Sequence, residues 1–197
     1  MKIGVLASQG AFAEHIAILK RLGAEAVPVR LPEDLQGIDG LIIPGGESTT
    51  ISKLMLAYKL SDEIRSLAKQ GIPIWGTCAG MIMLADKLPG STVEPLGLMK
   101  IGVRRNAFGR QKESFETELS IPALGKKPFP CVFIRAPAIE ESNGDVEVLA
   151  RLDDGTIVAV RQGKLLASAF HPELTDDPRF HQYFLHMVAE KKNNRKK

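Results

Sequence analysis

The sequence predicts an α/β fold in which helices cover both faces of a mostly parallel β-sheet. Short apolar runs alternate with amphipathic stretches of helical length through the first half of the chain. The apolar runs are uninterrupted, as in strands buried on both faces, and glycine closes the helical stretches. At 197 residues the chain is too short for two full-sized domains, so we expect a single three-layer α/β/α sandwich.

The first elements follow this alternation. An apolar strand at residues 3–6 is followed by a glycine turn at Gly10 and an amphipathic helix over residues 11–22. Two further apolar runs predict strands at residues 26–30 and 40–43. A β-α-β series of this kind favours parallel pairing of the strands.

Capping residues mark the next helices. Ser48 and Ser61 are candidate N-caps of two successive helices, and the second helix ends at Gly71. A buried strand over residues 72–76 then leads into a helix over residues 79–88. The alternation of strand and helix therefore continues to residue 88.

The pattern changes after residue 96, where short strand-like segments separated by turn residues predict antiparallel strands. The run Asp153-Asp154-Gly155 between two such segments is typical of a hairpin. An amphipathic helix over residues 178–191 closes the fold. We expect one domain over residues 1–190 and a disordered basic tail over residues 191–197.

Composition is that of an ordinary globular protein, with 44% hydrophobic and 25% charged residues and a formal net charge of +3. No apolar run reaches the roughly 18 residues of a membrane helix, and the first residues lack the features of a signal peptide. We therefore expect a cytoplasmic protein that contacts no membrane. Nothing predicts nucleic-acid binding, and the two cysteines, Cys78 and Cys131, suggest neither a disulfide framework nor a metal site.

One cysteine lies in a setting that favours catalysis. Cys78 sits where a buried strand turns into a helix, with Gly76 and Gly80 two residues to either side. This is the nucleophile-elbow pattern with sulfur in place of oxygen, in which the tight turn leaves room only for very small neighbours. The turn points the thiol out of the sheet, and the helix N-terminus favours the thiolate. A cysteine that merely packs as a small hydrophobe is the alternative.

A base for this cysteine is predicted near the end of the chain. His171 and Glu173 flank Pro172 directly after an apolar strand. Proline favours an extended conformation at His171, in which side chains two residues apart project to the same side. The carboxylate would then orient the imidazole, and the imidazole would take the proton of Cys78. We predict Cys78, His171 and Glu173 as a catalytic triad.

Acyl transfer also needs donors for the oxyanion that forms at the attacked carbonyl. Gly46 lies in a glycine turn at the end of a predicted strand, and Ala79 directly follows the cysteine. We expect their backbone N–H groups to form the oxyanion hole. A glycine turn before a helix can also bind phosphate, but neither glycine-rich nucleotide-binding pattern is present.

Together these motifs resemble the class I, or triad, glutamine amidotransferases, which they match in order and spacing. Further strings resemble one subfamily, the glutaminase subunits of pyridoxal 5'-phosphate synthase, and the resemblance covers essentially the whole chain. The strings are Gly46-Glu47-Ser48-Thr49-Thr50, Arg105 to Gln111, Ser114-Phe115-Glu116 and Phe133-Ile134-Arg135-Ala136-Pro137. One departure is Ser8, where the family usually carries an apolar residue.

The resemblance implies a flavodoxin-like sandwich and hydrolysis of L-glutamine to glutamate and ammonia through a thioester on Cys78. It implies no cofactor and no metal, and a partner synthase subunit that uses the ammonia to build pyridoxal 5'-phosphate. It further implies a set of residues that hold the glutamine, with arginine suited to its α-carboxylate and an acidic side chain to its α-amino group. This set is Gly46, Glu47, Ser48, Arg105, Ile134 and Arg135.

Three other readings compete with this one. The glutaminase subunit of imidazole glycerol phosphate synthase shares the triad but is disfavoured by the strings that begin at Arg105 and Ser114. A catalytically silent, amidotransferase-like binding protein would have lost part of the triad. A cysteine enzyme or chaperone on a similar fold would lack the terminal His171-Pro172-Glu173. We interpret Cys131 as a buried strand residue.

Overall fold

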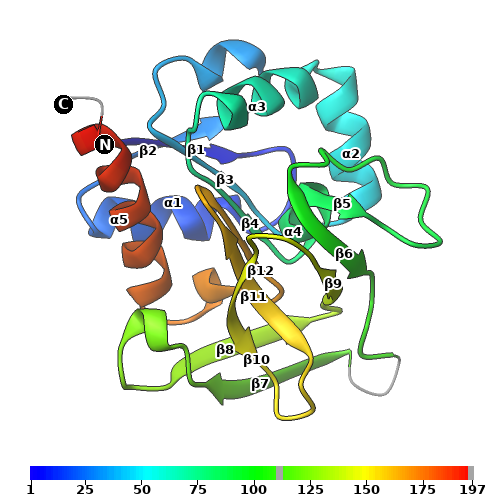
Figure 1. Cartoon of the computed structure of the whole chain (residues 1–197). Coiled ribbons are helices and arrows are strands. Elements are labelled where there is room, and N and C mark those ends of the chain that lie inside the picture. The colour runs from blue at the N-terminus through cyan, green and yellow to red at the C-terminus, as the bar shows by residue number, and fades with distance from the viewer. Residues whose placement is uncertain (110–112, 195–197) are drawn as a thin grey trace.

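The computed structural model describes residues 1–109 and 113–194, the last four by their backbone alone. Within these ranges, ten strands form the main sheet, in the order β2-β1-β3-β4-β12-β11-β9-β6-β5, with β10 paired to β11 (Figure 1). The first five strands of this order are all parallel to one another, which is the flavodoxin-like strand order. They are β1 (Lys2–Leu6), β2 (Glu25–Val29), β3 (Gly40–Ile43), β4 (Ile74–Thr77) and β12 (Leu165–Ser168).

Helices cover both faces of this parallel half. On one face lie α1 (Phe12–Arg21) and α5 (Arg179–Asn194), which meet through His15 and His181 beside the ring of Trp75. On the other face α4 (Ala79–Leu84) packs against β3 and β4, α2 (Ser48–Ala57) packs against α4, and α3 (Leu60–Lys69) packs against α2. The arrangement confirms the predicted three-layer α/β/α sandwich.

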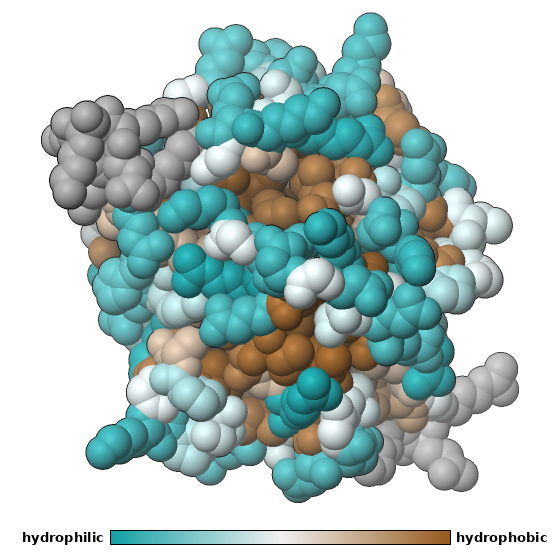
Figure 2. All heavy atoms as spheres, in the orientation of Figure 1, coloured by the Kyte–Doolittle hydropathy of each residue, from teal (hydrophilic) through white to brown (hydrophobic). Residues whose placement is uncertain are grey.

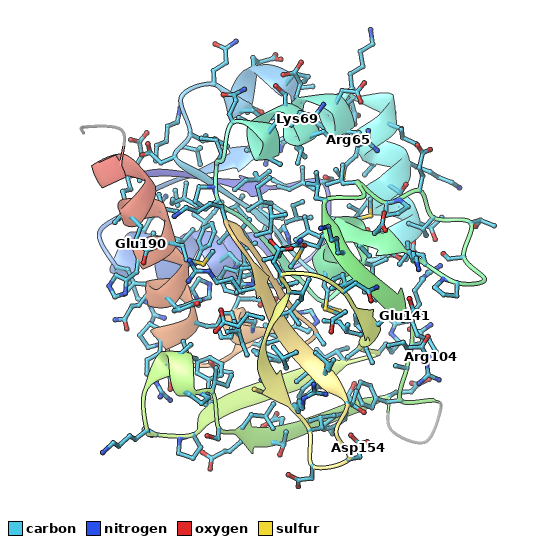
Figure 3. All side chains as sticks on the ribbon, in the orientation of Figure 1. Arg65, Lys69, Arg104, Glu141, Asp154 and Glu190 are labelled. Carbon is cyan, nitrogen blue, oxygen red and sulfur yellow. The ribbon has the colours of Figure 1, made fainter. Side chains whose placement is uncertain are left out.

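The second half of the main sheet is largely antiparallel, as predicted. Its strands are β5 (Ala85–Lys87), β6 (Met99–Arg104), β9 (Ala138–Ser142), β10 (Glu147–Arg151) and β11 (Ile157–Gln162). The predicted hairpin joins β10 to β11, and Asp154 lies at its tip (Figure 3). A separate two-stranded sheet pairs β7 (Ser114–Leu119) with β8 (Phe129–Ile134). Short 3-10 turns are η1 (Pro32–Leu35), η3 (Pro122–Leu124) and η4 (Pro172–Leu174).

Two predicted helix caps are wrong. The N-cap of α2 is Glu47, whose carboxylate accepts hydrogen bonds from the N–H groups of Thr49 and Thr50, and Ser48 is the first helical residue. At α3 the chain enters through Lys59 in the left-handed conformation, so Ser61 lies inside the helix and is buried. The true N-caps thus precede Ser48 by one residue and Ser61 by two residues.

The helix predicted over residues 79–88 stops at Leu84. Its last carbonyl groups are taken by a distant segment, because Leu96 donates to Met83 and Leu98 to Leu84 at 2.7 and 3.0 Å. Ala85 then turns extended and begins β5. At the other end of the chain α5 continues to Asn194, so four residues of the expected tail are helical in backbone. The rest of that tail lies outside the described residues.

The core consists of the apolar faces of the sheet and the helices, with Trp75 and several phenylalanines fully buried. Hydrophilic residues cover most of the face that Figure 2 presents, with hydrophobic residues visible between them near the middle of the view. Among the residues that the structure describes, none of the helices combines the length and apolar character that a membrane crossing requires.

Candidate active site

Cys78 occupies a strained turn between β4 and α4. Its φ of 49° and ψ of −107° lie outside the regions favoured by side chains, as the nucleophile-elbow prediction requires. A Cβ on Gly76 would lie 2.4 Å from the carbonyl of Gly80, and a Cβ on Gly80 would lie 1.8 Å from the carbonyl oxygen of Ile43. Both flanking glycines are therefore required by close packing of the helix on the sheet.

His171 and Glu173 lie side by side, although not in the predicted extended segment. His171 has φ −106° and ψ 85°, and Glu173 lies in the 3-10 turn η4 that follows. Proline at the first position starts this turn, and the turn brings Oε1 of Glu173 to 2.7 Å from Nδ1 of His171. The backbone N–H of His171 donates to Val132 of β8 at 2.8 Å, which fixes the turn against the small sheet.

The absence of a side chain at Gly45 leaves room for the imidazole of His171 beside Cys78. A Cβ at Gly45 would lie 2.5 Å from Cε1 of His171 and 3.2 Å from Cβ of Cys78, so a side chain there would fill the space where the two meet. The thiol also lies 3.8 Å from the carbonyl oxygen of Ile134. All three predicted triad residues are buried, with exposures of 6% for Cys78, 7% for His171 and 5% for Glu173.

Electrostatics favour a charged histidine at this site. Burial opposes the charge, but hydrogen bonds to Cys78 and Glu173 prevail and raise the pKa of His171 to about 10. Burial likewise disfavours the Glu173 carboxylate, yet the neighbouring His15 and His171 hold the pKa of Glu173 well below its usual range. At Cys131, burial raises the pKa of the thiol, which fits its interpretation as an inert strand residue.

The predicted site residues line one cavity of about 390 Å³ at the carboxyl ends of the parallel strands. Glu173 is the exception, since it lies behind His171 and does not line the cavity. Four residues of the wall were not predicted. Two of them follow β1, where the rule that ligands bind beyond the carboxyl ends of parallel strands could have found them. The predicted lining residues are Gly46, Glu47, Ser48, Cys78, Ala79, Arg105, Ile134, Arg135 and His171, and the missed ones are Gln9, Gly10, Ile82 and Asn106.

Two charged residues of the cavity already contact each other. Nη2 of Arg105 lies 3.5 Å from Oε1 of Glu47, and the Glu47 carboxylate also accepts the capping bonds of α2. Burial would raise the pKa of Glu47, but hydrogen bonds from Thr49 and Thr50 lower it to about 2. The cavity therefore presents an ionised carboxylate beside the guanidinium group of Arg105, and Arg135 also lines it. Of the string that begins at Arg105, Arg110 and Gln111 lie outside the described residues.

Two buried histidines behind the triad were not predicted. His15 of α1 lies 3.3 Å from Oε2 of Glu173, and His181 of α5 lies 2.9 Å from His15. No local motif marks them, because they come from two helices at opposite ends of the chain. Ser8, where the sequence departs from the family pattern, has a buried hydroxyl with no hydrogen-bond partner among the described residues.

Comparison with known proteins agrees with this geometry. A profile of the SNO glutamine amidotransferase family matches residues 5–190. The pyridoxal 5'-phosphate synthase subunit PdxT of Dehalococcoides mccartyi is 62% identical over 190 residues, which cover 95% of this chain and 97% of that protein. The subunit of the same name from Herpetosiphon aurantiacus is 60% identical over 188 residues, which cover 94% of this chain and 99% of that one.

A solved structure supports the same relationship. The crystal structure of a glutamine amidotransferase superposes on this chain with a TM-score of 0.90 at 53% identity, and the match covers 95% of this chain and 98% of that one. The family profile spans nearly the whole chain, and relatives of about 60% identity match it almost from end to end. The chain therefore belongs to the SNO glutamine amidotransferase family.

Proposed function

We propose that this chain is the glutaminase subunit of a pyridoxal 5'-phosphate synthase, and that Cys78 is its nucleophile. The observation that carries the proposal is the meeting of a strained elbow cysteine with a buried His171–Glu173 pair at one cavity. A thiolate held beside an imidazolium is the reactive form of a catalytic cysteine. Glutamine supplies a side-chain amide whose carbonyl carbon such a thiolate attacks.

The reaction proceeds by acyl transfer. The Cys78 sulfur adds to the amide carbon, and the C–N bond breaks as His171 gives its proton to the leaving nitrogen, which departs as ammonia. His171, now neutral, takes a proton from water, and the resulting hydroxide attacks the thioester. Glutamate leaves and Cys78 is regenerated. Glu173 holds the imidazole through Nδ1, so that Nε2 is the nitrogen that exchanges the proton.

The negative charge of each tetrahedral intermediate needs donors placed in advance. The N–H of Ala79 belongs to the first turn of α4, where backbone donors have no partner within the helix. Gly46 lines the same cavity from the end of β3. We assign these two backbone groups to the oxyanion hole.

The remaining polar wall suits the α-amino and α-carboxylate groups of the substrate. Arg105 and Arg135 carry the positive charge that attracts the α-carboxylate, and ionised Glu47 attracts the α-ammonium group. Ser48 and Ile134 complete this wall beside Gly46. Because Arg105 already lies beside Glu47, substrate binding exchanges part of this ion pair for contacts with the zwitterionic substrate.

The partner follows from the relatives, which are named as subunits of pyridoxal 5'-phosphate synthase. We propose that the ammonia passes to the synthase subunit of that enzyme within a complex, because ammonia released into water would be protonated and lose its nucleophilicity. These names disfavour the imidazole glycerol phosphate synthase alternative. We place the complex in the cytoplasm, in agreement with two free cysteines in the chain.

The test is glutamate release from glutamine by the chain together with the synthase subunit. We expect Cys78→Ala to lower kcat by at least about 10³-fold, as does the loss of a catalytic nucleophile in general. Cys131→Ser is the matched control, because it changes the other buried cysteine and should retain turnover. Glutamate release by the complex that is equal for wild type and Cys78→Ala would refute the proposal.

A further inference from the structure

A line of buried polar side chains continues behind the proposed triad. Nδ1 of His171 lies 2.7 Å from Oε1 of Glu173, and the other carboxylate oxygen, Oε2, lies 3.3 Å from Nε2 of His15. Nδ1 of His15 in turn lies 2.9 Å from Nε2 of His181. His15 and His181 are fully buried, and neither lines the cavity. Figure 1 shows why they meet, since α1 and α5 lie side by side on one face of the sheet.

We propose that His15 is a positioning residue of the glutaminase reaction, which holds the second oxygen of Glu173, and that His181 fixes the tautomer of His15. This inference rests on the proposed function, because it extends the role of Glu173 in orienting His171. The residues therefore form a relay of His181, His15, Glu173 and His171 that ends at Cys78.

The need for His15 follows from the geometry of the carboxylate. The Glu173 side chain is fully buried, and His171 occupies only one of its two oxygens. A buried carboxylate oxygen without a donor is costly, and a carboxylate held at one oxygen alone can turn about its terminal bond. Oε2 makes no hydrogen bond of good geometry among the described residues, and Nε2 of His15, 3.3 Å away, is a ring nitrogen that can supply its donor.

The positions of the protons on the two histidines follow from the groups at either end of the relay. An ionised carboxylate only accepts hydrogen bonds, so Nε2 of His15 carries a proton. In a neutral His15, Nδ1 is then an acceptor, and it accepts a hydrogen bond from the Nε2–H group of His181. The second nitrogen of His181, Nδ1, has no partner among the described residues, which fits a ring nitrogen that carries no proton. The tautomer of each histidine is thus set by the next group along the line.

The surroundings keep His181 neutral. Burial lowers its pKa well below the usual value, and the charge of Arg21 acts in the same direction, while Glu173 opposes it. From β4, the ring of Trp75 packs edge-on against both imidazoles, at 5.5 Å from His15 and 5.0 Å from His181. Thr77 of the same strand places its hydroxyl oxygen 3.4 Å from Nε2 of His15 and accepts the N–H of Gly45 at 3.1 Å. This contact joins the relay to the glycine turn beside the cysteine.

The first experiment compares two substitutions at His15 in the complete complex with the synthase. His15→Leu removes the donor, whereas His15→Gln can place its amide nitrogen near the position of Nε2. We expect His15→Leu to lower kcat for glutamine hydrolysis by about 10- to 100-fold, the cost known for losing a group that orients a metal-binding histidine. KM for glutamine should stay within about twofold, because His15 does not line the cavity. His15→Gln should recover most of the loss.

The pH profile separates positioning from packing. Without its second donor Glu173 holds His171 less well, so the alkaline limb of kcat/KM in His15→Leu should move to lower pH. His186→Leu is the matched control, because His186 is an exposed histidine of α5 outside the relay and should leave the profile unchanged. If the alkaline limb does not move, or if Gln rescues no better than Leu, the positioning role is wrong.

A measurement on the unmodified chain covers the case in which His15→Leu fails to fold. Nitrogen NMR distinguishes protonated from unprotonated imidazole nitrogens. We expect a proton on Nε2 of both His15 and His181 and none on Nδ1 of either. An unprotonated Nε2 at His15 would overturn the inference. If the wild-type complex shows no Cys78-dependent glutamate release, the proposed function fails instead, and the NMR result still reports on the relay.

Discussion

His171 is held between two partners, the thiol of Cys78 and the carboxylate of Glu173. Its raised pKa of about 10 means that the imidazolium is present through the neutral range. The folded state favours the charged form of His171, so this residue stabilises the fold at low pH. Its contribution to the free energy of unfolding is complete below the unfolded pKa of about 6.5 and is lost as the pH rises through about 10. Activity that needs the imidazolium should therefore decline only at alkaline pH.

Glu173→Gln tests this pair. The amide keeps the shape of the side chain but removes its charge, so the pKa of His171 should fall and the alkaline limb of kcat/KM should move toward neutral pH. We expect kcat/KM to fall by up to about 10⁴-fold, the loss in kcat found when the orienting carboxylate of a serine-protease triad is replaced by an amide. The pH dependence of glutamate release in the complex measures both effects. An unchanged alkaline limb would contradict a role for Glu173 in holding the charge.

Among single residues, the sequence predicted the reactive side chains better than it predicted the side chains that contact them. Cys78 was predicted from two flanking glycines, and His171 and Glu173 from their spacing about a proline. The contact of Glu173 with His15 had no local signal, since 158 positions along the chain separate the two (173 − 15). A long-range pair of this kind becomes visible only when the fold brings α1 against η4.

The elbow is the element in which local sequence and tertiary packing constrain each other most closely. Gly80 lies in the first turn of α4, where it lets the helix approach the carbonyl oxygen of Ile43. The site depends on this approach, because α4 carries both Ala79 and the end of the turn that holds Cys78.

Gly80→Ala should therefore be costly. Its Cβ would lie 1.8 Å from a backbone oxygen that cannot turn aside, so α4 must shift away from the sheet. We expect a loss of at least about 2 kcal/mol in the free energy of unfolding, measured by urea denaturation. Gly102→Ala is the control, because its Cβ would lie 3.3 Å from a side-chain atom of Glu141, and its change should stay below about 1 kcal/mol. Equal losses in the two variants would show that close packing at Gly80 is not the cause.

Element boundaries were predicted less well than element types. Strands β1, β3 and β4 and helix α1 lie close to their predicted positions, because hydrophobic periodicity marks buried faces directly. The ends of α2, α3 and α4 were misplaced, because the cap of α2 is a long carboxylate and the end of α4 is bonded to residues 96–98. The bonds at the end of α4 join residues too far apart in the chain for a local propensity argument to detect them.

The whole molecule depends on its outer helix layer. The C-terminal helix α5 covers the face of the sheet that carries Trp75 and also places His181 against His15. Phe184 is fully buried there, with its ring centre 5.6 Å from that of Trp75. The same helix thus supports the core and the groups behind the active site.

Phe184→Ala should destabilise the chain by about 3–5 kcal/mol, through lost burial and the cavity that remains. Gln182→Ala changes an exposed position of the same helix and should stay within about 0.5 kcal/mol. Urea unfolding of both variants gives the comparison. If Phe184→Ala unfolds no more easily than Gln182→Ala, α5 does not carry the core in the way that its burial indicates.

The sequence by itself determined the fold class, the parallel half of the sheet, the three residues of the proposed triad and, with the family resemblance, nine of the thirteen residues of the cavity wall. It did so because periodicity, glycine spacing and the His-Pro-Glu run are short-range signals of burial, of tight turns and of paired side chains. The tertiary structure alone decided where α4 ends, that a 3-10 turn rather than an extended strand pairs His171 with Glu173, and that two buried histidines stand behind that pair. These features arise from contacts between segments far apart in the chain, and the energy of such contacts is fixed by packing that no local pattern encodes.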